Sequence, residues 1–227
     1  ESKIVVRFWI IGILLALFMI VPLLVLILFA FSESSLLKFP ITGLTFAWFE
    51  RLAEMREFWS SLRNSIIIAG TVGVISTIFG TIAAFGLMNL QLKSRAVGVS
   101  LITLPVMLPP LVLGISLLSF YSTIGLPLGL HSVIIGHLVV AQPFVILIVY
   151  ARMATFDPAI VASARDLGAS PQKAFFTVTL PIIRPTIIGA AMIAVALSLD
   201  DFVITFFIIG GENTLPTLLW GMLRKGV

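Results

Sequence analysis

The sequence predicts an all-α integral membrane protein, and three observations support this. Of its 227 residues, 59% are hydrophobic and only 11% are charged, whereas a soluble domain carries about 25% charged residues. The mean hydropathy is +1.19. The apolar runs are continuous rather than alternating with a period of two, which favours membrane helices over barrel strands. This composition excludes a disordered chain, a coiled coil and a cytosolic enzyme, and the lack of cysteine excludes disulfides and thiol chemistry.

Stretches without charged residues predict five membrane-spanning helices within a single domain, 1–227. The first stretch is long enough for about 36 Å of helix, which crosses a hydrocarbon core and is too long for a signal peptide. The uncharged stretch 96–151 is too long for one span, and turn-forming residues at 122–129 divide it. The predicted spans are 8–31, 65–88, 97–120, 132–153 and 186–208.

Between the first two spans, a helical pattern at about 46–61 predicts an amphipathic helix. Apolar residues recur there at spacings of three and four, with charged residues between them: Trp48, Leu52, Met55, Trp59 and Leu62. We expect this helix to lie at the outer membrane interface, with its Trp side chains at headgroup depth. It either caps the bundle or forms a docking surface for an external partner.

Lys and Arg in short loops predict the orientation, because positively charged loops stay in the cytoplasm. They occur before the first span, at 93–95 and between the last two spans, whereas 121–131 contains none. The N-terminus and residues 154–185 are therefore expected in the cytoplasm. We interpret the net charge of +4 as a result of topology rather than of nucleic-acid binding. Five spans leave the C-terminus outside, so we expect a fragment of a longer chain with a further C-terminal span.

The cytoplasmic segment 154–185 contains the start and stop signals of two short helices. Asp157 and Pro158 suit the start of the first helix, and Gly168 suits its end. Ser170 and Pro171 repeat the start signal, and we expect the second helix to end at Pro181. The segment could be an ordinary ordered connection. Two well-capped helices instead suit the transmission of force to a cytoplasmic partner, since most connections are short.

The same segment resembles the EAA loop of permease subunits of binding-protein-dependent ABC importers. The resemblance rests on Ala162–Ser170, followed by Thr179-Leu180-Pro181, and extends to Leu104–Gly114 and Asn64-Ser65. It departs from the family pattern at Ala162 and Ser163, because the family has Glu where Ala162 stands. The family's helix in this loop sits in a groove of a separate ATPase. The implied ATPase-coupling residues are Ala162, Ser163, Ala164, Arg165, Asp166, Gly168, Ala169 and Ser170.

This resemblance implies the type I ABC importer permease fold, usually with six spans, in a bacterial inner membrane. It also implies partners: a second, similar but non-identical permease subunit, two cytoplasmic ATPase subunits and a soluble substrate-binding protein. The chain has no G-x-x-x-x-G-K-[ST] phosphate loop. We therefore expect a non-catalytic transport subunit that binds no cofactor itself, with ATP and magnesium on the partner ATPase.

Two adjacent carboxylates, Asp200 and Asp201, lie in the outer half of the last predicted span. A charge at the bilayer centre costs at least about 2.5 kcal/mol, so an ionisable group there suggests a functional site. Adjacent helical positions point about 100° apart, so the two cannot face one small target unless the helix unwinds. Gly210-Gly211 beyond them favours a broken outer end.

Residues 198–207, together with Leu215-Pro216 and Met222, resemble the polyamine (spermidine/putrescine) branch of the family. Carboxylates and aromatic faces suit a flexible polycation. The predicted substrate path or gate comprises Asp200, Asp201, Phe202, Phe206, Phe207 and Trp220. Asp201 could be structural or part of a gate, with Asp200 the more substrate-selective of the two. Two alternatives stay open: the aspartates could instead pair structurally, for instance with Arg or the backbone of a partner permease, and the cargo could be iron, an amino compound or a sugar.

Other classes of membrane protein fit the sequence less well. Adjacent aspartates on one helix do not converge as an aspartyl protease requires. His131 and His137 lack an H-E-x-x-H pattern, so no metal site is expected, and His137 is expected to hydrogen-bond a neighbouring helix. A channel or an ion-driven secondary carrier would explain the carboxylates but not the paired cytoplasmic helices.

Overall fold

The computed structural model describes residues 2–34, 38–41 and 43–225. The chain forms two compact units, Glu1–Phe58 and Trp59–Val227. The boundary follows from the first helix, because no residue of its apolar stretch Val6–Ala30 is buried. The two units are described separately below.

The first unit holds two helices, α1 (Ser2–Ala30) and α2 (Ala47–Glu54). Trp48 of α2 donates its indole N–H to the carbonyl of Ser32, just after α1, at 2.8 Å. The guanidinium of Arg51 lies 5.0 Å from the Trp48 ring centre. The predicted amphipathic helix 46–61 is interrupted at Met55, whose backbone is extended. Its second half therefore starts the next helix.

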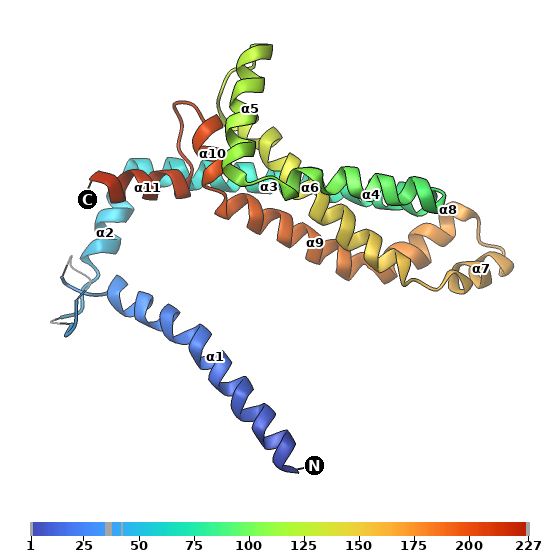
Figure 1. Cartoon of the computed structure of the whole chain (residues 1–227), viewed down its shortest axis with the longest axis horizontal. Coiled ribbons are helices and arrows are strands. Elements are labelled where there is room, and N and C mark those ends of the chain that lie inside the picture. Colours follow the sequence, from blue (N-terminus) through green and yellow to red (C-terminus); the bar gives the residue numbers. More distant parts are fainter. Residues whose placement is uncertain (1, 35–37, 42, 226–227) are drawn as a thin grey trace. The chain divides into compact units, whose positions relative to one another are not determined.

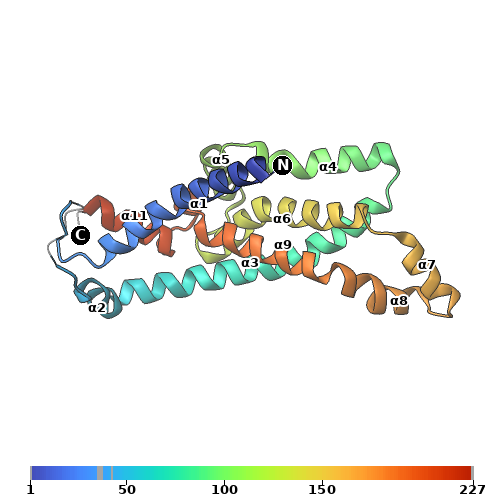
Figure 2. The ribbon, with the colours of Figure 1, turned by 90° about the horizontal axis from the view of Figure 1, so that it is seen from below.

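The second unit is built on three long helices, α3 (Arg56–Met88), α6 (Leu130–Ala154) and α9 (Leu180–Asp200). These lie side by side, with α4 (Leu92–Met107) along them (Figures 1 and 2). Small residues let the backbones approach. A side chain on Gly73 of α3 would collide with Val195 of α9, and one on Gly80 would lie 2.7 Å from Val145 of α6. This close packing of small residues is typical of membrane bundles.

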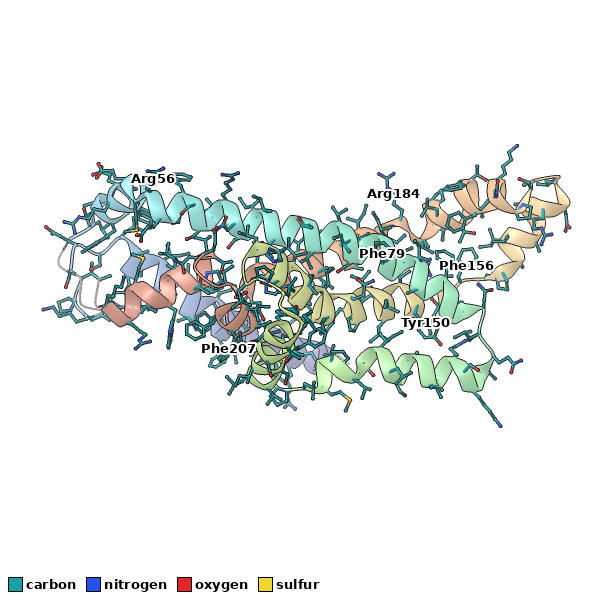
Figure 3. The ribbon with its side chains drawn as sticks, turned by 90° about the horizontal axis from the view of Figure 1, so that it is seen from above. Arg56, Phe79, Tyr150, Phe156, Arg184 and Phe207 are labelled. Carbon is teal, nitrogen blue, oxygen red and sulfur yellow. The ribbon has the colours of Figure 1, made fainter. Side chains whose placement is uncertain are left out.

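Shorter helices occupy the two ends of this bundle. At one end lie α7 (Pro158–Asp166), α8 (Pro171–Ala174) and the π-helical segment η1 (Phe175–Thr179). At the opposite end lie α10 (Val203–Ile208) and α11 (Leu215–Lys225). In Figure 3, Phe156 lies near the end that carries α7, and Phe207 lies toward the opposite end. The sequence placed the first end in the cytoplasm and the second outside.

The third predicted span, 97–120, is wrong as a straight helix. The chain instead forms α4 and α5 (Pro110–Ile124), which meet at an angle of 95°. The reason is the pair Pro109-Pro110, since neither residue has an N–H to continue the helix of α4. Four helices of the described residues are long and apolar enough to span a membrane, or five if this bent pair counts as one.

The second cytoplasmic helix does not end at Pro181 as expected. Residues Pro171–Asp200 form one continuous helix of 30 residues through α8, η1 and α9. Within η1 the amide of Leu180 bonds to the carbonyl of Phe175, so the regular ladder is shifted just before Pro181. A π-bulge at this point accommodates a proline that has no N–H to donate. The last predicted span is thus continuous with the cytoplasmic segment.

Candidate functional site

The last predicted span, 186–208, is broken where its two carboxylates lie. Helix α9 ends at Asp200, Asp201 has an extended backbone, and α10 starts at Val203. A second break follows at Gly210, whose φ of 72° lies in the left-handed region that favours glycine. The helix is therefore unwound at the aspartates and again at Gly210, as the sequence suggested for this outer end.

Asp201 turns inward and binds to its own chain. Its Oδ1 accepts the backbone N–H of Thr205 at 3.0 Å and lies 3.4 Å from Nε2 of His137. Its side chain retains 20% exposure. A carboxylate that accepts an amide of the first turn stabilises the start of a helix, so Asp201 serves as a cap for α10.

His137 on α6 reaches both sides of the break. Its Nδ1 lies 2.7 Å from the hydroxyl of Ser198 on α9, and its Nε2 lies 2.8 Å from the hydroxyl of Thr205 on α10. The expected hydrogen bond of His137 to a neighbouring helix is therefore confirmed. His131 is exposed, and within the described ranges no three His, Asp or Glu residues gather in a metal-binding arrangement.

Asp200 points elsewhere, because its side chain is exposed and lines a groove of about 700 Å³. The groove lies where the two broken spans meet. Pro110 contributes the start of α5, Val140 comes from α6, and the remaining lining comes from α9 and the break: Ile193, Ala196, Leu197, Asp201, Phe202 and Val203. The groove thus combines the exposed carboxylate of Asp200 and the largely buried one of Asp201 with largely apolar walls.

The four predicted aromatic residues gather beside this groove. The ring centres of Phe202 and Trp220 are 5.3 Å apart, those of Phe202 and Phe206 5.5 Å, and those of Phe206 and Phe207 also 5.5 Å. Phe207 packs on Gly114 of α5, where an added Cβ would lie 2.8 Å from its ring. The aromatic cluster therefore connects α10, α11 and the kinked α5.

A second pocket, of about 470 Å³, opens on the other side of this cluster. Its lining includes Phe206, Trp220 and charged groups of both signs: Glu212, Arg224 and Lys225. Glu212 was not predicted. Its Oε2 accepts the side-chain amide of Asn64 at 2.9 Å, and Ser65 accepts the amide of Leu215 at 2.9 Å. The polar pair Asn64-Ser65, directly after Arg63, was the signal in the sequence for this outer contact.

The predicted coupling segment forms a compact turn at the opposite end. Asp157 accepts the amide of Ala159 at 2.9 Å and so caps α7, while Ser170 caps α8. Between them Gly168 has a φ of 88°, as a helix-ending glycine requires. A shallow hollow of about 480 Å³ is lined by most of the predicted coupling residues: Ala162, Arg165, Asp166, Gly168, Ala169 and Ser170.

Sequence reasoning missed the apolar residue at the tip of this turn. The side chain of Leu167 is 90% exposed, although leucine is usually buried. Ser163, by contrast, hydrogen-bonds back to the carbonyl of Ala159 within α7. The sequence did contain a signal, because Leu167 stands between a charged residue and a helix-ending glycine. A leucine in that position follows the end of the helix and cannot pack as part of an apolar helix face.

Comparisons with known proteins agree with this architecture. Residues 76–225 match the family described as binding-protein-dependent transport system inner membrane component. The chain is 34% identical to the putrescine transport system permease protein PotI of Escherichia coli (strain K12), over 92% of this chain and 77% of that protein. It is 27% identical to the spermidine/putrescine transport system permease protein PotC of the same organism, over 92% of this chain and 80% of that protein.

A solved structure shows the same fold. The inward-facing MetNI methionine ABC transporter matches with a TM-score of 0.58 at 17% identity, over 79% of this chain and 83% of that chain. The expected ABC importer permease fold is thereby confirmed. The relatives are permease subunits, as expected for a transport subunit rather than an enzyme. Taken together, the bundle, the broken spans and the match over residues 76–225 show that this chain belongs to the family of inner membrane components of binding-protein-dependent transport systems.

Proposed function

We propose that this permease subunit carries a polyamine such as putrescine or spermidine. The observation that carries the proposal is the exposed carboxylate of Asp200 in a groove beside the ring of Phe202. A polyamine presents ammonium groups separated by methylenes. The carboxylate would bind an ammonium, and the aromatic rings would contact the methylenes and the cation. The similarity to PotI, a putrescine permease, and to PotC, a spermidine/putrescine permease, supports the same class of cargo.

Asp200 and Asp201 have separate roles in this proposal. Asp201 serves the chain itself, since its carboxylate accepts from Thr205 and contacts His137. Asp200 is the substrate-facing group, and Phe202, Phe206, Phe207 and Trp220 form the aromatic wall or gate. One accessible carboxylate on each subunit of a permease pair would place two such groups along a shared path.

The transport step is driven from the other end of the bundle. Residues 162–170 would dock on a cytoplasmic ATPase, with Leu167 as an apolar contact, because an exposed leucine gains by burial in a partner's groove. The continuous helix Pro171–Asp200 would carry the movement of this loop to the break. Alternation between inward- and outward-open states would then move the substrate past the groove.

The proposal includes the rest of the assembly. A second, similar but non-identical permease subunit, two ATPase subunits and a soluble substrate-binding protein complete the transporter. The N-terminus lies in the cytoplasm, because Lys and Arg concentrate on that side. ATP and magnesium bind to the ATPase subunits, since this chain has no phosphate-binding loop.

The test is uptake by the complete transporter in proteoliposomes, with ATP inside and the loaded binding protein outside. We expect radiolabelled putrescine or spermidine to accumulate, and Asp200→Asn to lower the rate about tenfold, as loss of a charge-assisted hydrogen bond predicts. The matched control is Glu50→Gln, which removes an exposed carboxylate on α2 and should leave the rate unchanged. Failure of polyamines to enter, with uptake of a sugar or metal chelate instead, would overturn the cargo assignment.

A further inference from the structure

A buried polar network crosses the break in the last span. It consists of His137, Ser198 and Thr205, whose exposed fractions are 3%, 7% and 0%, together with the half-buried Asp201. Three separate segments supply these side chains, namely α6, the end of α9 and the start of α10. Polar groups at this depth are rare, because each must find partners inside the bundle.

Every polar group of the network can be satisfied at once. A neutral His137 with its proton on Nε2 donates to the hydroxyl of Thr205 at 2.8 Å and accepts from the hydroxyl of Ser198 at 2.7 Å. Thr205 then donates its hydroxyl hydrogen to the carbonyl of Asp201 at 3.0 Å. The tautomer is assigned from these partners. The hydrogen bonds therefore run in one direction from α9 through α6 to the break.

Tight packing surrounds the network, so the arrangement has little freedom. Next to His137, Gly136 lies so close to α10 that an added Cβ would come within 2.5 Å of Ile208 and 3.3 Å of Leu117. On the other side Ala141 and Leu197 enclose His137, Ser198 and Asp201 with almost no free space. A fully satisfied network in such packing holds one geometry of the break.

The network also lies at a mechanically important place. Helix α6 leads into the coupling segment, and the helix Pro171–Asp200 leads out of it. His137, in the first half of α6, therefore joins the two helices that flank the coupling segment. Figure 2 shows α6 and α9 side by side. Through Thr205, His137 also holds α10, which carries Phe206 and Phe207.

We propose that His137 is the positioning residue of the translocation site. It keeps Asp201 turned inward, so that Asp200 presents the exposed carboxylate of the groove while Asp201 stays largely buried, and it makes α10 follow α6 and α9. This inference rests on the proposed function of the Asp200 groove, but it assigns a role to a residue that touches no substrate. Without His137, movement of the coupling segment would be transmitted to α9 but not to α10 and its aromatic residues.

The test measures polyamine molecules transported per ATP hydrolysed by the complete transporter in proteoliposomes. Five variants are compared: His137→Ala, His137→Gln, Thr205→Val, the double variant of His137→Ala with Thr205→Val, and the control His131→Ala, which changes the chain's other, exposed histidine. Assembly with the partner subunits and the apparent unfolding temperature are measured in parallel. Thr205→Val is nearly isosteric, so it removes the hydroxyl with little change in packing.

We expect His137→Ala and Thr205→Val each to lower the transport-to-ATP ratio about tenfold, as expected for breaking a buried hydrogen-bonded network. The double variant should be little worse than either single one, because both break the same network. His137→Gln, which retains a donor and an acceptor, should recover part of the ratio, and His131→Ala should match the wild type.

Two outcomes would overturn the role of His137. One is an unchanged ratio in Thr205→Val and His137→Ala, even if the unfolding temperature falls, since this indicates packing alone. The other is a His137→Gln variant no better than His137→Ala. A wrong cargo assignment would show differently, as absent polyamine uptake in the wild-type transporter, and the ratio would then be measured with the cargo that does enter.

Discussion

At the scale of single residues, the two adjacent aspartates differ because helix α9 ends at Asp200 and the backbone of Asp201 is extended. Asp201 accepts a backbone amide and contacts His137, whereas Asp200 is exposed in the groove. A carboxylate that satisfies buried groups contributes to stability, while an exposed one contributes little. Adjacent acidic residues in this chain therefore have separable effects on folding and on transport.

This difference predicts that substituting the two aspartates changes the stability of the subunit by unequal amounts. Asp201→Ala should destabilise the subunit by about 1–3 kcal/mol, because the amide of Thr205 loses its acceptor and the ring of His137 loses the nearby carboxylate. Asp200→Ala should change stability by less than about 0.5 kcal/mol, as expected for an exposed residue. The measurement is chemical unfolding in detergent, followed by Trp fluorescence. Equal destabilisation by both substitutions would contradict the assignment.

The residues of the site were only partly predictable from sequence. Asp200 and Asp201 stood out because charges are rare in a span, and the aromatic residues followed from their vicinity. The link from His137 to Ser198 and Thr205 could not be predicted, since these residues lie 61 and 68 positions apart. Such a contact depends on how α6 packs against α9 and α10, and hydropathy carries no information about helix packing.

At the scale of helices, the main errors concern where helices bend and stop. Hydropathy reports that a segment is apolar, but it does not report the direction of the helix axis. The stretch 97–120 was therefore predicted as one span, although Pro109-Pro110 imposes a bend of 95°. Conversely, Pro181 was predicted to end a helix that continues through it, because the preceding π-helical turn removes the need for its N–H.

The turn between α7 and α8 gives a prediction at this scale. Gly168 has a φ of 88°, a value that proline, fixed near −65°, cannot adopt. Gly168→Pro should therefore abolish ATP hydrolysis stimulated by the loaded binding protein, while the subunit still inserts and assembles. Gly168→Ala should have a smaller effect, because an alanine in the left-handed region costs about 1–2 kcal/mol and no neighbouring atom blocks its Cβ.

The measurement for this turn is ATPase activity of the purified transporter with and without binding protein. The control is also a Gly→Pro substitution, but outside a long helix, since Gly70→Pro, for example, would break α3. The matched control is therefore Gly211→Pro, in the loop at the opposite end. In this control, we expect the binding protein to stimulate ATP hydrolysis more strongly than in Gly168→Pro. Retained stimulation in Gly168→Pro would show that the turn does not transmit movement.

At the scale of the whole molecule, the second unit places the two proposed sites far apart along its length. The coupling segment with α7 and α8 lies at one end, and the break between α9 and α10 lies toward the other (Figure 1). The groove lies at this break. The helix Pro171–Asp200 and α6 connect them, and His137 joins these helices near the groove. Membrane class and family resemblance were predictable from sequence because they depend on composition and short motifs. The division into two units was not predictable, because it depends on long-range contacts.

The central claim is that the segment around α7 is a cytoplasmic contact for an ATPase. Because the chain has no cysteine, a single introduced cysteine can be labelled selectively. We would compare Ala162→Cys in the coupling segment with Ser122→Cys in the predicted outer loop, using a membrane-impermeant maleimide on right-side-out and inverted vesicles. Both positions are exposed. Cross-linking of the same cysteines to the ATPase subunit completes the measurement.

We predict that Ala162→Cys reacts only in inverted vesicles and cross-links to the ATPase subunit, whereas Ser122→Cys reacts only in right-side-out vesicles and does not cross-link. Labelling of Ala162→Cys from the outer side, or its failure to cross-link in an active transporter, would contradict the coupling role of this segment.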